Sequence, residues 1–273
     1  HRLRLVTYHR YPLRACTTNP SDPAYPSIPH LLADSASAGL AAPLARYARI
    51  AHAHHLPFRV AEMNSASCEG AKGVSDTFAS ALWALDTMFN FAAAGVDGVN
   101  FHMLPGSNYE LFTVSHGASG DWQAFVHPEY YGLMMFAQAF PPGARLQKVT
   151  APGGPVKVWA TRAADGTERV TFINQDTLSA HDVSVTVPGA TTAGSVETLD
   201  APNIASTDGV MIGGQSFGDE TTTGTLPGPP STTPVAPVNG AYTVSLPPGS
   251  AALLTIPPMP APAPPSGGGG GGL

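Results

Sequence analysis

Glu62 is the residue whose place in the sequence most clearly indicates chemistry. It follows a short run of β-forming residues, Pro57-Phe58-Arg59-Val60-Ala61, and it precedes a loop of small residues that begins at Met63. A helical pattern opens soon afterwards, at Ser75. In β/α barrels, catalytic groups lie at this kind of position, where a strand ends before a loop and a helix. A carboxylate there can be a catalytic group, or it can be a strand-end residue in a surface salt bridge.

Three strand-and-helix units surround this residue in the first half of the chain. Strands are predicted at residues 3–8, 58–61 and 96–103, because β-forming residues alternate with polar ones or form short apolar runs. Helices are predicted at residues 31–54, with a break near Pro43, at residues 76–94 with Ser75 as N-cap, and at residues 131–140. The order β-α-β-α-β-loop-α is typical of a parallel barrel, although three units cannot close one of eight.

The second half of the chain has a different pattern. Short β-type runs separated by Gly, Pro, Asn and Asp predict an antiparallel β-sandwich; they are residues 156–160, 168–174, 182–187, 194–199, 242–246 and 251–256. We therefore expect an α/β region at residues 1–142 and a β-sandwich domain at residues 143–257. The sandwich has its own candidate core, comprising Val158, Val170, Phe172, Val183, Val185, Leu246 and Leu253. The Pro/Gly-rich tail at residues 258–273 is expected to be disordered.

Several motifs carry a resemblance to a known family. Ala61-Glu62-Met63-Asn64-Ser65, together with the helix pattern from Gly73 to Asp86, resembles the nucleophile strand and following helix of the family 79 glycoside hydrolases, the β-glucuronidase and heparanase-like enzymes. The segments at residues 209–218 and 242–254 are similar to the C-terminal β-domain of the same family. The resemblance covers residues 1 to about 257. It implies the C-terminal portion of a (β/α)8 TIM barrel followed by a β-sandwich.

The resemblance implies roles for individual residues. Glu62 would be the nucleophile of a retaining hydrolase of β-glucuronides, and Tyr11 would orient it by donating a hydrogen bond. His9 and His102 would line the sugar pocket, although each can also be a residue of the barrel rim, as can Tyr11.

The uronate carboxylate would be bound by a tyrosine in the motif Pro128-Glu129-Tyr130-Tyr131-Gly132. We assign this role to Tyr130, with Tyr131 as the second choice. Cys68-Glu69 stands where heparanase-like members have a Gly-Gly pair that offers backbone N–H groups to that carboxylate. Glu69 adds a negative charge there, which would weaken binding of an anionic sugar unless its side chain turns outward.

The second catalytic carboxyl group is missing from the motifs. In this family the acid/base lies in an Asn-Glu-Pro-like turn well before the nucleophile, and no such turn occurs in the chain. The resemblance thus implies a chain that corresponds to the C-terminal part of an enzyme and is inactive alone. Two other functions remain open. The chain can be a non-enzymatic carbohydrate-binding or structural remnant, or it can derive from another exo-glycosidase of the same barrel clan.

Composition limits the partners. Of 273 residues, 12% are charged, the formal net charge is −6, and no basic block occurs, so nucleic acid is not expected as a partner. No apolar run is long enough to span a bilayer. The opening residues, His1-Arg2-Leu3, are interpreted as the approach to a strand rather than a leader peptide. No cofactor is expected, and a secreted location is implied by the resemblance alone.

Cys16 and Cys68 are the two cysteines of the chain, so one disulfide or none can form. They follow adjacent barrel strands, in loops at the same rim, which makes a bond feasible. Two neighbouring free thiols are the alternative. No metal site is expected, because His52, His54 and His55 do not share one helix face. Trp122 can stack on a sugar at the barrel mouth, but burial against its loop is the favoured interpretation.

Overall fold

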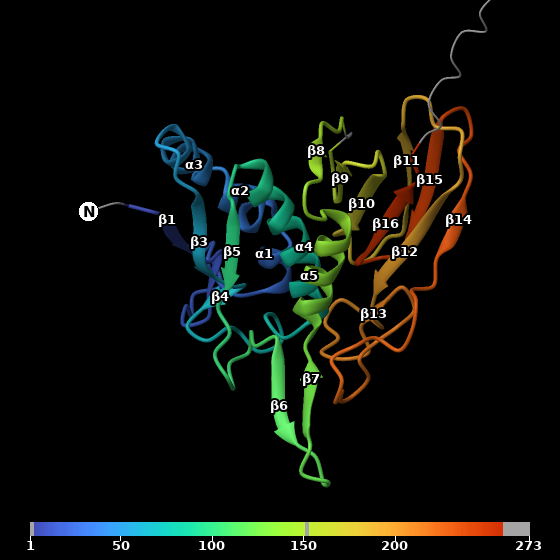
Figure 1. The fold of residues 1–273 in the computed structure, drawn as a ribbon. Helices are drawn as coiled ribbons and strands as arrows, with labels where there is room; N and C mark the ends of the chain where they lie inside the picture. Colours follow the sequence, from blue (N-terminus) through green and yellow to red (C-terminus); the bar gives the residue numbers. More distant parts are fainter. Residues whose placement is uncertain (1–2, 151–152, 259–273) are drawn as a thin grey trace, which may run out of the picture.

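The computed structural model describes residues 3–150 and 153–258. Figure 1 shows the parallel strands on one side of the molecule and the antiparallel sheets on the other, with helices α4 and α5 between them. Most of the expected tail, residues 259–273, lies outside the described residues.

The three predicted parallel strands pair in the order β1-β3-β5. They are β1 (Val6–Arg10), β3 (Phe58–Met63) and β5 (Gly98–Phe101). Between β1 and β3 the chain forms four short helical segments in place of the one or two predicted, namely α1 (Ile28–Leu31), η1 (Asp34–Ala36), α2 (Ala38–Ala41) and α3 (Leu44–Ala53). Helix α3 begins directly after Pro43, because proline fits the start of a helix but not its interior.

The long helix α4 (Phe78–Ala93) begins two residues later than predicted, and the prediction that Ser75 is its N-cap is wrong. The Ser75 hydroxyl is occupied in the loop after β3, where it accepts hydrogen bonds from Ala71 N and Ser65 Oγ. The first free N–H groups of α4 instead donate to the β-domain, from Phe78 to Ser206 O and from Ala79 to Ile204 O. Tertiary contacts thus replace a local side-chain cap.

Three further elements connect β5 to the β-domain side. An antiparallel hairpin, β6 (Phe112–His116) and β7 (Trp122–Val126), occupies a region that we predicted as loop. Helix α5 (Pro128–Ala139) follows it and begins earlier than predicted, since Pro128 stands in its first turn. Short strands β2 (Leu13–Arg14) and β4 (Ala66–Ser67) pair with each other beyond the ends of β1 and β3.

The predicted β-rich region forms one large antiparallel sheet and a two-stranded one. The large sheet has the order β13-β12-β16-β10-β9-β8 with β14 paired to β12, and the small sheet pairs β11 with β15. The bounds are β8 (Arg145–Gln147), β9 (Val156–Arg162), β10 (Glu168–Asn174), β11 (His181–Thr186), β12 (Gly194–Asp200), β13 (Met211–Ile212), β14 (Thr233–Val235), β15 (Ala241–Leu246) and β16 (Ser250–Ile256).

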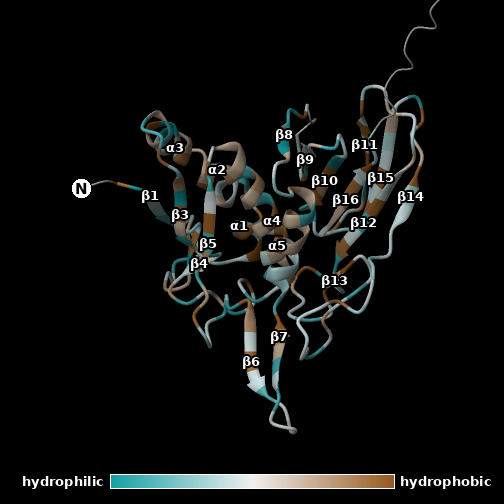
Figure 2. Cartoon of the chain, viewed as in Figure 1, coloured by the Kyte–Doolittle hydropathy of each residue, from teal (hydrophilic) through white to brown (hydrophobic). Residues whose placement is uncertain are grey.

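Two apolar cores result, one on each face of the large sheet. The space between the two sheets holds Phe172, Tyr242 and Leu254, together with every residue of the predicted sandwich core except Leu253. Leu253 faces the opposite way and joins a larger core with α4 and α5. That larger core also contains Ile173, Leu199 and Ile212 of the β-domain, so it crosses the expected boundary near residue 142. Figure 2 shows α4 and α5 largely brown along this layer.

Candidate active site

Glu62 lies at the end of β3 and faces the same side of the sheet as His9. The pairing of β1 with β3 shifts between Tyr8 and His9, so that Tyr8 lies opposite Val60 while His9 lies opposite Glu62. Because side chains alternate along a strand, regular pairing would turn Glu62 to the buried side with Phe58 and Val60. The irregularity, a β-bulge, turns the carboxylate to the open side of the sheet.

Both oxygens of the Glu62 carboxylate have a partner. The Tyr11 hydroxyl donates to Oε1 at 3.0 Å, and His9 Nδ1 lies 3.4 Å from Oε2. Burial, and secondarily the Glu62 carboxylate, raises the pKa of Tyr11, so the phenol stays protonated and remains a donor. The Glu62 side chain is 36% exposed. The carboxylate is therefore held in one orientation while its surface remains accessible.

His102 connects Tyr11 to a second tyrosine. Its Nδ1 lies 3.2 Å from the Tyr11 oxygen and 2.9 Å from the Tyr109 oxygen. Burial, followed by the charges of Glu62 and Glu69, raises the pKa of Tyr109. The Glu62 cluster thus consists of Glu62, His9, Tyr11, His102 and Tyr109. Four of these residues are predicted site residues, and Tyr109 is the one that we did not predict.

Buried polar groups hold the cluster from behind. Asn64 is fully buried, and its side-chain N–H groups donate to the carbonyls of His102 at 3.0 Å and Tyr109 at 3.2 Å. Its Oδ1 accepts the Ser65 N–H at 2.6 Å. One side chain thereby connects the loop after β3 to the loop after β5, which fixes Glu62 relative to His102 and Tyr109.

Glu129 lies beside this buried amide and is only 1% exposed. Within the described part of the chain, neither of its carboxyl oxygens has a hydrogen-bond partner. Asn64 favours the ionised form, but its N–H groups are already used by the two carbonyls, and burial dominates. The pKa of Glu129 is therefore raised well above its usual range, and burial favours the neutral carboxyl group.

The loop that carries Tyr109 is closed by Glu110. The Glu110 carboxylate accepts the Gly106 N–H at 2.7 Å and the Thr113 hydroxyl, and it lies 3.7 Å from His127 Nε2. Burial lowers the pKa of His127, so this imidazole is less easily protonated than usual. These contacts join the loop before β6 to the end of β7.

The rim near Glu62 carries the two cysteines. Cys16 and Cys68 are joined by a disulfide, with their Cα atoms 5.8 Å apart. Cys68 and Glu69 have φ angles of 63° and 66°, and Glu69 O accepts the Asn108 N–H at 2.9 Å. The Glu69 side chain is exposed. The bond ties the loop after β1, which carries Tyr11, to the loop after β3.

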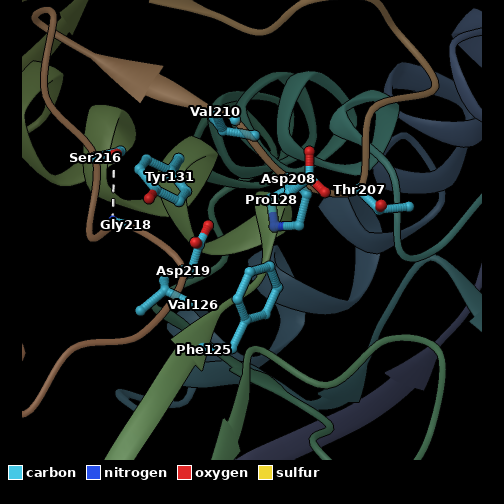
Figure 3. Close-up of a pocket in the computed structure, with 11 residues that line it drawn as sticks. Phe125, Val126, Pro128, Tyr131, Thr207, Asp208, Val210, Ser216, Gly218 and Asp219 are labelled. Carbon is cyan, nitrogen blue, oxygen red and sulfur yellow. Dashed lines mark hydrogen bonds between the residues drawn. The ribbon is translucent and has the colours of Figure 1, made fainter.

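Tyr130 and Tyr131 belong to a different cluster. Tyr130 packs edge-on against Phe112, with the ring centroids 4.7 Å apart. Tyr131 is buried, and its hydroxyl accepts a hydrogen bond from Phe217 N at 3.0 Å. None of the contacts of either side chain among the described residues reaches the Glu62 cluster. Figure 3 shows Tyr131 with Asp208 and Asp219 around a cavity of about 70 Å³, which is too small for a sugar ring.

The histidines considered as metal ligands do not form a site. His52 Nε2 lies 2.7 Å from the Asp97 carboxylate, which also accepts the Phe58 N–H. Across residues 3–150 and 153–258, no group of three His, Cys, Asp or Glu side chains is arranged to hold a metal ion. A search of those same residues finds no helix that combines the length and apolar character needed to cross a membrane.

Solved structures of several glycoside hydrolases share the fold of this chain. A 4-O-α-L-rhamnosyl-β-D-glucuronidase from Fusarium oxysporum matches with a TM-score of 0.74 and 20% identity, over 92% of this chain and 53% of that one. A GH51 arabinofuranosidase from Xanthomonas axonopodis pv. citri matches with a TM-score of 0.60 and 18% identity, over 92% of this chain and 52% of that one. At these identities the likeness concerns the fold.

Sequence comparison concerns mainly the second half of the chain. Residues 158–253 match the glycosyl hydrolase family 79 C-terminal beta domain. A β-glucuronidase of Aspergillus niger is 32% identical over 97 residues, which are 36% of this chain and 18% of that protein. The resemblance predicted from the sequence is thus confirmed for the C-terminal β-domain of family 79 glycoside hydrolases. The chain spans about half the length of the solved structures that it matches.

Proposed function

We propose that this chain is the C-terminal part of a retaining glycoside hydrolase that acts on β-glucuronides, with Glu62 as the nucleophile. The main support is the environment of Glu62: a tyrosine hydroxyl at 3.0 Å from one carboxylate oxygen and an imidazole at 3.4 Å from the other, at the end of the middle parallel strand. These two contacts hold the carboxylate in one orientation, and a carboxylate held in this way can attack the anomeric carbon of a sugar.

The reaction proceeds in two displacements. Glu62 attacks the anomeric carbon while the aglycone oxygen leaves with a proton from an acid, which gives a glycosyl–Glu62 ester and a free alcohol. Water then attacks the same carbon, loses its proton to the conjugate base of that acid, and releases the Glu62 carboxylate. The acid must lie about 5–5.5 Å from Glu62. No second carboxylate belongs to the Glu62 cluster in the described residues, so we assign the acid to a segment outside this chain.

The same proposal concerns the barrel of the parent protein. We propose that strands β1, β3 and β5 are the last three strands of an eight-stranded barrel, with residues 1–142 as the catalytic region and residues 143–257 as the β-domain. The side chains on the open face of the sheet are polar, among them Thr7, His9 and Asn100, which suits the interior of an active-site barrel mouth. By itself the chain should not turn over a glucuronide, because general acid–base help contributes about 10²–10⁴-fold.

For the sugar, we propose a uronate on the grounds of the named activities of the relatives from Aspergillus niger and Fusarium oxysporum. His9 and His102 would line its pocket. Because Tyr131 is engaged by Phe217, and Tyr130 by Phe112, a role for either in holding the uronate carboxylate would require these contacts to change. A secreted parent protein is also part of the proposal, as the resemblance to the family implies.

One observation favours a second candidate, a neutral exo-glycosidase of the same fold. The Glu69 carboxylate is near enough to raise the pKa of Tyr109, and a negative charge there disfavours an anionic sugar. Its exposed side chain can turn away, so the uronate remains our first choice.

Mechanism-based labelling tests the proposal. The protein that contains this chain and its upstream segment is incubated with a 2-deoxy-2-fluoro-β-glucuronide carrying a good leaving group, and the labelled peptide is identified by mass spectrometry. We expect the label on Glu62, and none on the E62Q variant. A label on another carboxylate would show that Glu62 is not the nucleophile. A panel of nitrophenyl glycosides separates glucuronidase from arabinosidase, xylosidase or glucosidase activity, and no turnover of any of them would favour the non-enzymatic remnant.

A further inference from the structure

The β6–β7 hairpin projects from the end of the molecule at which the parallel strands end (Figure 1). Its cross-strand pairs are Phe112 with Val126, Val114 with Ala124, and His116 with Trp122. Directly opposed residues share one face of a hairpin, so these six side chains form a continuous row from base to tip. Thr113, Ser115, Gln123 and Phe125 lie on the other face.

The outer part of this row is exposed. Trp122 is 64% and Val114 is 57% exposed, whereas Val126 at the base is buried. The burial that we expected for Trp122 is therefore wrong. The His116 and Trp122 rings lie 3.8 Å apart between centroids, which holds the indole in a defined position. We call the exposed residues Val114, His116 and Trp122, together with the half-buried Ala124, the Trp122 stripe.

The hairpin is fixed relative to Glu62. The loop before β6 carries Tyr109, which reaches the Glu62 cluster through His102. Within that loop, Glu110 contacts Thr113 on β6 and lies 3.7 Å from His127, directly after β7. On the outer edge of β7, Ala124 and Thr221 exchange two backbone hydrogen bonds of 2.9 Å. A ligand that extends from Glu62 toward this end of the molecule would therefore meet a preformed surface.

We propose that the Trp122 stripe binds neutral pyranose rings of an extended carbohydrate chain whose terminal sugar occupies the Glu62 site. This inference rests on the function proposed above and specifies its substrate as an oligosaccharide or polysaccharide. Indole rings stack against the C–H face of a pyranose, and an aromatic wall with few charges suits a neutral chain. The stripe contains no carboxylate and no Lys or Arg.

A protein partner fits this surface less well. A stable interface needs about 800 Å² from each partner, whereas a whole aromatic side chain offers only about 150–250 Å². One indole, one valine and one imidazole thus fall far short of that area. A narrow row of rings and methyl groups matches the width of a sugar chain.

The first experiment measures binding to the chain itself. Cellotetraose, a neutral β-linked tetrasaccharide, is titrated into the protein while the indole N–H signals are followed by NMR. We expect the Trp122 signal to move and those of Trp83 and Trp159 to stay. W122A should weaken binding on the order of tenfold, a typical consequence of losing an aromatic contact, whereas W122F should retain most of it. S115A, on the opposite face, is the matched control and should leave this binding unchanged.

The second experiment uses the protein that includes the upstream segment. It compares nitrophenyl glucuronide with cellotetraose that carries a β-linked glucuronate at its non-reducing end. W122A should raise KM for the long substrate and leave the short one unchanged. Equal kinetics of W122A and wild type on both substrates would overturn the inference, as would the absence of any cellotetraose binding. A dimer that W122A converts to monomers would assign the stripe to a second copy instead. If neither glucuronide is hydrolysed but cellotetraose binding still depends on Trp122, the proposed hydrolase function is wrong, whereas the Trp122 stripe is still a carbohydrate-binding surface.

Discussion

The two sides of the parallel sheet have opposite characters. One side packs on α4 and α5, and through them on the β-domain, in a continuous apolar core. The other side is open and polar and carries the Glu62 cluster. We call them the closed side and the open side. The closed side contains stacked rings, and N–H groups of α4 donate to carbonyls of the β-domain, while the open side contains polar side chains that contact one another. Substitutions on the closed side should therefore affect stability, and those on the open side should affect function.

The largest effect is expected for F89A on the closed side. Phe89 is fully buried and stacks on Trp159 of β9, with centroids 5.4 Å apart. Phe-to-Ala changes in cores cost about 3–5 kcal/mol. Because the core is shared, we expect one unfolding transition, shifted as a whole, in both calorimetry and limited proteolysis. Y47A, at an exposed position, is the control. Two transitions, with only the first half of the chain affected, would show that the regions are stabilised separately and that the β-domain survives alone.

The second-largest effect on stability is expected at the rim that carries the two cysteines. Replacing both cysteines, C16S with C68S, removes a bond that closes a loop of 52 residues in sequence separation. The expected loss is about 2–4 kcal/mol of unfolding free energy. Chemical denaturation of the oxidised protein and the double variant measures it. Thiol labelling of denatured, non-reduced protein should find no free thiol, and recovery of two thiols would contradict the bond itself.

Glu129, behind the Glu62 cluster, predicts a dependence of stability on pH. Its folded-state pKa is raised by burial, so the folded state binds this proton more tightly than the unfolded state. The resulting stability is fully present below the unfolded pKa of about 4.3 and is lost as the pH rises toward the folded value. E129Q cannot ionise and should remove this loss. At neutral pH we expect the free energy of unfolding of E129Q to exceed that of wild type.

Denaturation curves at several pH values above 4 test this expectation, with E220Q at an exposed position as the control. Parallel curves for wild type and E129Q would mean that the ionised Glu129 carboxylate finds a partner in solution.

The smallest stability effect is expected on the open side, from Y11F. The change removes one partly buried hydrogen bond to Glu62, which is worth about 0.5–1.5 kcal/mol. In the protein that includes the upstream segment, we expect a much larger relative loss in kcat than in stability, because the carboxylate is no longer oriented. Glucuronide kinetics and thermal unfolding of the same samples give the two numbers. A variant with unchanged kcat would show that Tyr11 only packs at the rim.

The local sequence predicted many of the elements well. The three parallel strands, the long helix that begins at Phe78, and the β-rich second half all follow patterns of period two or 3.6 that depend on nearby residues. Glu62 could be selected because catalytic groups in such folds stand at strand ends, whereas Tyr11, His9 and His102 followed from the resemblance to the family 79 enzymes. Tyr109 was missed because it lies in the middle of a loop. A loop position has no periodicity that could indicate a role, and only the contact with His102 identifies Tyr109.

Other features depended on partners distant in the chain. Ser75 has the residue type of an N-cap, yet the first N–H groups of α4 donate to the carbonyls of Ile204 and Ser206. The Ser75 hydroxyl instead accepts a hydrogen bond from within the loop after β3. Leu253 has the pattern of a sandwich-core residue, yet it packs toward the helices, because both faces of β16 are buried and alternation alone cannot distinguish them. The shared core follows from this packing.

The sequence by itself determined that a carboxylate ends the second parallel strand and that a β-domain follows. Only the tertiary structure decided which way that carboxylate faces. Regular alternation would place Glu62 with Phe58 and Val60 against the helices. The shift in pairing with β1 places it opposite His9 and within reach of Tyr11. A bulge is set by the hydrogen bonds of two strands some fifty residues apart in the chain, so the residues next to Glu62 do not specify it.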